Sequence, residues 1–150
     1  MKFGDWEYPY DLFIKSIAQK IRYTNDKKLA EYNLTSPQGL LLELIDRSIR
    51  REKEITRRSL EYVMNLKGPS ITNLLNGLEK KGCIIRNTGI SDARTFHIEV
   101  TAEGKKILKE MEEIFEETEE QLLEGMSEDE KRIFLDLLIK AYKNLDGHLA

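Results

Sequence analysis

The sequence predicts a mainly α-helical fold with one small antiparallel β-hairpin, and three observations lead to that prediction. Apolar residues recur at steps of three and four along most of the 150 residues. Two short segments rich in β-forming residues flank a turn-rich stretch near residue 90. Two Ser/Thr-x-x-Glu/Gln capping boxes mark helix starts. At this length we expect a single domain, residues 1–150.

The first two helices are predicted from spacing and caps. Over residues 9–31, Tyr10, Phe13 and Ile17 fall on one face, after a proline that suits a first helical turn. A second helix starts at the capping box Thr35-x-x-Gln38 and runs to about residue 49.

Two further helices follow, a short one over residues 58–64 and a longer one over residues 69–81. The longer helix has one apolar stripe, formed by Ile71, Leu74, Leu75 and Leu78. Its remaining face is polar and nearly uncharged, with Ser70, Thr72, Asn73 and Asn76. Gly82 ends the helix as a left-handed cap would.

The hairpin comes next. Residues 83–86 and 95–100 are predicted strands, separated by the turn-rich loop 87–93. Thr101 then caps a long helix that Gly125 closes, and the capping box Ser127-x-x-Glu130 opens the last helix.

Charge is unevenly distributed along the chain. Residues 1–49 carry 7 basic and 7 acidic side chains, residues 50–97 carry 10 and 5, and residues 98–150 carry 7 and 15, within a net charge of −3. A basic middle segment between a neutral and an acidic one is typical of a DNA-facing module on a scaffold that does not face DNA. A chance fluctuation of surface charge is the competing interpretation.

Two helices joined by a short turn and followed by a hairpin form a winged helix-turn-helix, whose second helix enters the major groove of DNA. The hydroxyl and amide side chains of Ser70, Thr72, Asn73 and Asn76 suit hydrogen bonds to base edges. Arg57, Arg58 and Lys67 lie near helix starts, where phosphate contacts fix register. The helix start at Gly68 and Pro69 offers backbone N–H groups to a phosphate.

At these residues the chain resembles the MarR family of transcriptional regulators. Residues 74–82 (LLNGLEKKG), Asp92-x-Arg94 and the junction Val100-Thr101-x-x-Gly104 match its signatures, and the similarity covers nearly the whole chain. Residues 68–75 (GPSITNLL) further resemble the MepR-like multidrug-efflux repressors.

The resemblance implies a cytoplasmic homodimer that binds an inverted repeat in double-stranded DNA. Residues 35–103 would form the DNA-binding region, and residues 1–34 and 104–150 the dimerisation helices. Arg94 would reach into the minor groove at the wing tip, with Asp92 holding the wing by a salt bridge. An A·T-rich minor groove attracts such an arginine.

A ligand-responsive repressor also needs an effector site. Tyr10, Phe13, Ile17, Met111 and Phe115 could line an apolar pocket for a small apolar or aromatic effector. The same residues suit a dimer core equally well.

With one cysteine and two histidines we expect no metal site and no cofactor. Cys83 is expected to be a small buried hydrophobe.

Three other functions differ from this one in what they predict. An enzyme is nearly excluded, because no phosphate loop, nucleophile elbow or metal-ligand cluster appears. An architectural DNA-binding protein or activator of the same fold would show no ligand-induced release. A winged helix used only for protein contact would be indifferent to neutralisation of Arg94.

Overall fold

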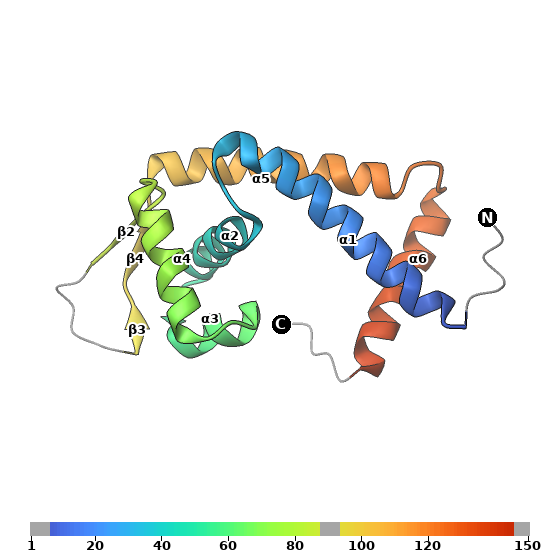
Figure 1. The fold of residues 1–150 in the computed structure, drawn as a ribbon, viewed down its shortest axis with the longest axis horizontal. Coiled ribbons are helices and arrows are strands. Elements are labelled where there is room, and N and C mark those ends of the chain that lie inside the picture. Colours follow the sequence, from blue (N-terminus) through green and yellow to red (C-terminus); the bar gives the residue numbers. More distant parts are fainter. Residues whose placement is uncertain (1–6, 88–93, 146–150) are drawn as a thin grey trace. The chain divides into compact units, whose positions relative to one another are not determined.

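The computed structural model describes residues 7–87 and 94–145 and confirms the mainly α fold with a small antiparallel strand pair (Figure 1). In chain order the elements are α1 (Pro9–Leu29), the 3-10 helix η2 (Ala30–Tyr32), α2 (Ser36–Arg50), β1 (Ile55–Thr56), α3 (Arg57–Met64), α4 (Gly68–Lys80), β2 (Ile84–Arg86), β3 (Thr95–Phe96), β4 (Ile98–Val100), α5 (Ala102–Leu122) and α6 (Glu128–Asn144).

Both predicted capping boxes are formed. The Gln38 amide N–H donates to Thr35 Oγ1 at 3.3 Å, and the Ser127 amide N–H donates to Glu130 Oε2 at 2.8 Å. A third box, not predicted, opens α3, where the amide N–H of Ser59 donates to Thr56 Oγ1 at 3.1 Å. This cap starts α3 at Arg57, one residue earlier than apolar spacing indicated.

The predicted strand 95–100 is wrong in one respect, because it is two strands. Its second half, β4, pairs antiparallel with β2 and places Ile84 opposite Val100. Its first half, β3, pairs with β1, which sequence reasoning missed. The chain changes partner at His97, whose carbonyl accepts from the Asn87 N–H at 2.8 Å.

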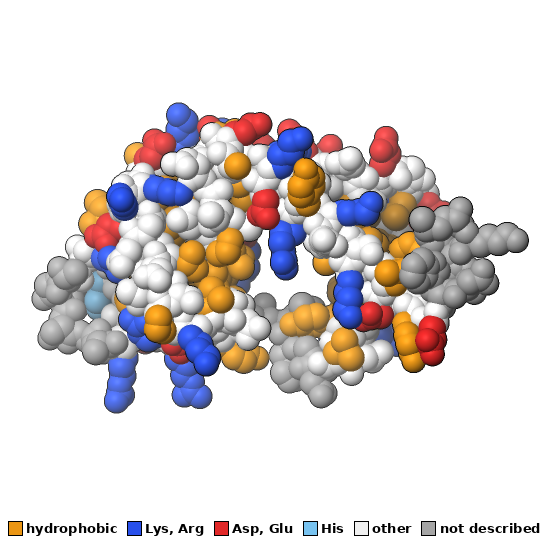
Figure 2. Space-filling view, in the orientation of Figure 1, with side chains coloured by type: hydrophobic (Ala, Val, Ile, Leu, Met, Phe, Trp, Pro, Cys, Tyr) orange, Lys and Arg blue, Asp and Glu red, His pale blue; other side chains and the backbone are white. Residues whose placement is uncertain are grey.

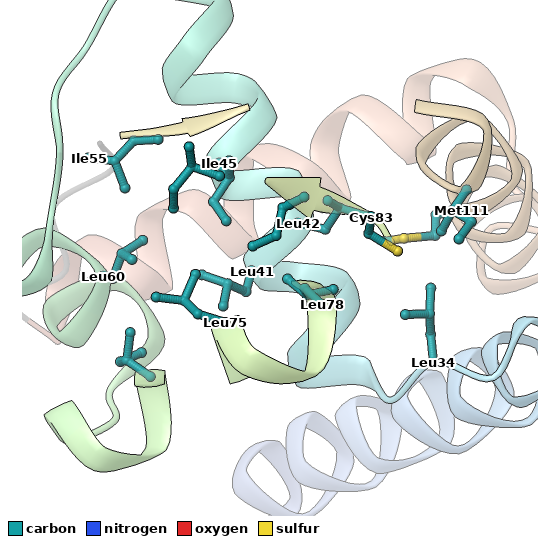
Figure 3. Close-up of a cluster of buried hydrophobic side chains, with 14 of the residues drawn as sticks. Leu34, Leu41, Leu42, Ile45, Ile55, Leu60, Leu75, Leu78, Cys83 and Met111 are labelled. Atoms are coloured by element: carbon teal, nitrogen blue, oxygen red, sulfur yellow. The ribbon is translucent and has the colours of Figure 1, made fainter. Parts of the chain in front are cut away.

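The core of the first part of the chain is built between α2, α4, the strands and the start of α5. Figure 3 shows side chains from these elements meeting in one apolar cluster, with Cys83 and Met111 pointing toward each other. Leu41, Leu42 and Ile45 of α2 and Ile71, Leu75 and Leu78 of α4 are fully buried. Each such side chain stabilises the fold by roughly 1.5–3 kcal/mol, so α4 is held firmly by its apolar stripe.

The start of α5 is fixed to the end of α4 by close backbone contacts. The Thr101 N–H donates to the Cys83 carbonyl at 3.0 Å, and its hydroxyl donates to the Gly82 carbonyl at 2.5 Å. Thr101 Oγ1 also accepts from the Gly104 N–H at 3.0 Å, as the predicted cap requires. Gly82 has φ +74°, the left-handed conformation expected at a helix end.

By its contacts the chain divides into two units, Met1–Phe115 and Glu116–Ala150. The second unit holds the end of α5, the turn at Gly125 and the whole of α6. No residue of α6 is buried, although its sequence is rich in apolar residues. Within the described residues no helix is long and apolar enough to cross a membrane.

Candidate nucleic-acid interface

Helix α4 separates an apolar face from a polar one. Ile71, Leu75 and Leu78 are buried, whereas Ser70, Asn73 and Asn76 are exposed. The exposed face carries only hydroxyl and amide groups at these positions, which can both donate and accept hydrogen bonds. The residues predicted to read bases therefore lie together on one solvent-facing side of a rigidly packed helix.

Thr72 lies at the edge of that face and is half-buried. Its Oγ1 accepts a hydrogen bond from Arg57 Nη1 at 3.1 Å, and the same nitrogen donates to the Gly68 carbonyl at 3.1 Å. The Arg57 guanidinium also lies 5.2 Å from the centre of the Phe96 ring. Arg57 thus connects the start of α3, the first turn of α4 and strand β3. Its predicted phosphate contact stays a prediction.

The N-terminal end of α4 offers fewer backbone donors than the sequence indicated. Pro69 has no N–H, and the N–H groups of Ser70 and Ile71 both donate to the Lys67 carbonyl, at 3.0 and 3.2 Å. Few backbone N–H groups at this helix start are therefore left for an anion, and the nearby side-chain cations are the stronger candidates for a phosphate contact.

Arg58 and Lys67 supply such cations. Both are exposed, one in the first turn of α3 and the other directly before α4. Figure 2 shows Lys and Arg side chains projecting from the side of the first unit that carries α3 and β3. Flexible charged side chains beside an uncharged reading face are the arrangement in which phosphates position a protein and bases specify the site.

A contact between α4 and the wing was missed by sequence reasoning. Arg86 of β2 donates from Nε to Glu79 Oε2 at 2.6 Å and from Nη2 to Asn76 Oδ1 at 2.6 Å. Nη2 also lies 2.5 Å from Glu79 Oε2. The LEKKG motif places Glu79 near the helix end, but no local sequence signal shows that Arg86 folds back onto α4.

The wing itself is described up to its outer loop. Arg94 is exposed and directly precedes β3. Asp92, its predicted salt-bridge partner, lies outside the described residues. The predicted role of the pair therefore stays a prediction.

The five residues predicted to line an effector pocket occupy different environments. Met111 is buried, and its Cε would lie 2.9 Å from a Cβ on Gly39, so it fills the core. Phe115 packs against that core, whereas Tyr10 and Phe13 are exposed on α1 and Ile17 is half-buried. An open hollow on α1 includes none of the five; it is lined by Glu7, Tyr8, Asp11, Leu12, Lys15, Ser16 and Gln19.

The side chains that could support other chemistry are few. Cys83 is buried, as predicted. Burial raises the pKa of its thiol, and the nearby Glu103 carboxylate adds to the effect, while Lys81 opposes it. A thiol held protonated in this way is a poor nucleophile. Within residues 7–87 and 94–145 no group of three or more His, Cys, Asp or Glu side chains could hold a metal ion.

Known proteins resemble this chain in sequence and in fold. Residues 24–111 match the family model described as transcriptional regulator SarA/Rot. MepR of Staphylococcus aureus in complex with DNA is 27% identical over 93% of this chain and 98% of its own, with a TM-score of 0.75. A putative MarR family transcriptional regulator from Clostridium acetobutylicum is 33% identical over 92% of this chain and 99% of its own, with a TM-score of 0.65. These proteins regulate transcription and are not enzymes.

Proposed function

The chain belongs to the SarA/Rot family of DNA-binding transcriptional regulators, of the MarR type, and on that premise we propose that it represses a promoter as a homodimer bound to an inverted repeat. The observation that carries the proposal is helix α4, whose uncharged face of Ser70, Asn73 and Asn76 is exposed while its other side is locked into the core. A helix of that kind fits the major groove. A regulator that reads genomic DNA is expected in the bacterial cytoplasm.

Unburied apolar surface supports the homodimer. On α6, Ile133 is 54% exposed, Leu137 59% and Leu138 42%. On α1, Tyr10 is 84% exposed. A second copy of the chain would remove this surface from water. We therefore assign residues 1–34 and 104–150 to dimerisation and residues 35–103 to DNA binding, within a single functional domain.

The DNA contacts divide by chemistry. Ser70, Asn73 and Asn76, with Thr72 at the edge, are proposed to contact base edges. Arg57, Arg58 and Lys67 are proposed to position phosphates. The helix start at Gly68 and Pro69, where few N–H groups are left, is proposed to lie beside a phosphate without being its main donor. Arg94, held by Asp92, is proposed to enter the minor groove at the wing.

We also propose regulation by a small apolar or aromatic molecule. Only a small energy is needed, since a tenfold loss of affinity for DNA corresponds to about 1.4 kcal/mol of differential binding. Tyr10, Phe13 and Ile17 on α1 and Phe115 on α5 remain the proposed contacts, whereas Met111, which is buried and fills the core, is no longer proposed as one. The exposure of Tyr10 and Phe13 leaves them accessible to an effector or to a partner subunit.

Footprinting of the purified protein on the promoter of its own gene and on neighbouring promoters tests the function. The proposal predicts protection of an imperfect palindrome spanning about two helical turns. It also predicts a steep loss of protection as salt rises, because phosphate contacts release counterions. Protection that is independent of DNA sequence would contradict the proposal. So would the absence of any protection at low salt.

A further inference from the structure

The two exposed asparagines of α4 are not equivalent. The side chain of Asn73 has no hydrogen-bond partner within residues 7–87 and 94–145. Asn76 Oδ1, in contrast, accepts from Arg86 Nη2 at 2.6 Å. Arg86 is held in turn by Glu79, at 2.6 Å from Nε, and its side chain is only 25% exposed. The Asn73 amide is therefore free to turn, whereas the Asn76 amide is held by a hydrogen bond from Arg86 of β2.

This grip fixes the direction of the Asn76 amide. A guanidinium carries only donors, so the oxygen and not the nitrogen of Asn76 must face Arg86. The –NH2 group is then the end left for a partner, and the adjacent positive charge strengthens it as a donor. A two-pronged pair with adenine needs the amide oxygen to accept from N6 while the nitrogen donates to N7. Asn73 can make that pair, whereas one of the two lone pairs of the Asn76 oxygen is occupied by Arg86 and the direction of its amide is set by that contact.

We propose that Arg86 and Glu79 set the base preference of α4 through Asn76, by holding it as a hydrogen-bond donor. Asn76 then selects a base with an acceptor in the major groove, which is N7 or O6 of guanine, O4 of thymine or N7 of adenine, and disfavours cytosine, which presents only the N4 donor. Asn73 keeps both functions and suits adenine. Arg86 and Glu79 are positioning residues that act through Asn76. The inference rests on the proposed function, because it presumes that α4 reads bases.

The test uses the full-length protein and a pool of DNA duplexes with about 20 randomised base pairs, the span of two half-sites. Bound duplexes are sequenced for the wild type, Arg86→Met, Asn76→Ala and the double variant. The matched control is Arg47→Met, which removes an arginine that forms a comparable ion pair, with Glu43 at 2.6 Å on α2. Thermal unfolding is recorded for each protein.

The wild type and Arg47→Met should enrich an inverted repeat in which one position of each half-site prefers bases with a major-groove acceptor over cytosine, about tenfold. Arg86→Met and Asn76→Ala should each abolish that preference while other positions keep theirs. In the double variant the Arg86 change should add nothing, because a residue that acts through Asn76 has no effect without it. Asn76→Asp still accepts from Arg86 but presents an acceptor outward, so the preference should turn toward cytosine or adenine.

Other results overturn the inference in distinguishable ways. If Arg86→Met folds and enriches the same bases as the wild type, Arg86 does not set the preference. If Arg86→Met changes the base preference of the Asn76→Ala protein as much as that of the wild type, Arg86 does not act through Asn76. If Asn76→Ala weakens all sequences alike, the acceptor is a phosphate and not a base. Should Arg86→Met unfold, Glu79→Met, which removes the carboxylate that holds Arg86 with little change of size, must weaken the same preference. A failure of the proposed function looks different, since the wild type itself would enrich no sequence.

Discussion

A Cβ atom on Gly104 would lie 2.2 Å from the carbonyl oxygen of Cys83, closer than any side chain tolerates. The contact exists because that carbonyl accepts from the Thr101 N–H while Gly104 packs in the first turn of α5. It places α5 directly against the end of α4. The Thr-x-x-Gly signature thus has a physical reason, namely a helix start that only glycine can bring so near a backbone carbonyl.

Gly104→Ala should destabilise the protein by roughly 2–4 kcal/mol, because the obstructing atom belongs to the backbone and cannot turn away. The matched control is Gly77→Ala in α4, whose new Cβ would meet the end of the Gln38 side chain, with Nε2 at 2.7 Å, and a side-chain amide can shift where a backbone carbonyl cannot. That change should alter stability by less than about 1 kcal/mol. Urea unfolding measures both, and equal stability of the two variants would contradict the close-packing account.

Stability should fall at high pH in a way that depends on Cys83. Burial raises the pKa of its thiol in the folded chain, so the unfolded state loses its proton first. Below an ordinary thiol pKa of about 8.5 the group adds no pH dependence, and above it stability should decline by at most about 1.4 kcal/mol per pH unit until the folded thiol ionises. Cys83→Ala should show a shallower decline in urea unfolding from pH 8 to 10. Identical slopes would mean that Cys83 is not shielded.

Arg94→Ala should weaken operator binding by roughly 1–3 kcal/mol and leave the thermal midpoint nearly unchanged, since an exposed wing residue contributes little to the core. Arg132→Ala, which removes an exposed arginine paired with Asp129 at 2.9 Å on α6, serves as the control for lost charge. Fluorescence anisotropy with operator DNA provides the comparison. Equal affinities of the two variants would remove Arg94 from the interface.

Leu137→Glu should convert the dimer to a monomer, because it puts a charge on the apolar side of α6. Lys143→Glu, on the opposite side of the same helix, should leave the dimer intact. Sedimentation velocity at micromolar concentration separates the 17.5 kDa chain from its dimer. A wild type that sediments as a monomer throughout this range would refute the dimeric assembly.

Local signals predicted most of the helices. The capping boxes at Thr35 and Ser127 and the left-handed Gly82 follow from residues within four positions of one another, so the sequence contains them directly. The apolar stripe of α4 likewise marked which of its sides faces solvent. These features predict which face of α4 is exposed.

Local signals of this kind could not predict the contacts between segments that are distant in the sequence. Strand β1 is only Ile55–Thr56, and it pairs with Thr95–Phe96 from the far side of the wing, so no alternating pattern is long enough to indicate it. The tertiary packing of α3, α4 and the strands decides two further contacts. These are the contact of Arg57 with Thr72 and Phe96 and the hydrogen bond from Arg86 to Asn76. From the sequence alone, Arg57 is therefore predicted only as a phosphate contact, and Arg86 has no predicted role.

The central claim, that two copies of α4 enter the major groove on one side of the duplex, is tested by a mobility-shift assay on the selected inverted repeat and on the same repeat with about five base pairs inserted at its centre. Half a helical turn moves one half-site to the opposite side of the DNA. The account predicts that the insertion reduces affinity to the level of unrelated DNA. Undiminished affinity for the spaced repeat would mean that the subunits bind independently, and would contradict the dimeric reading of DNA proposed for this chain.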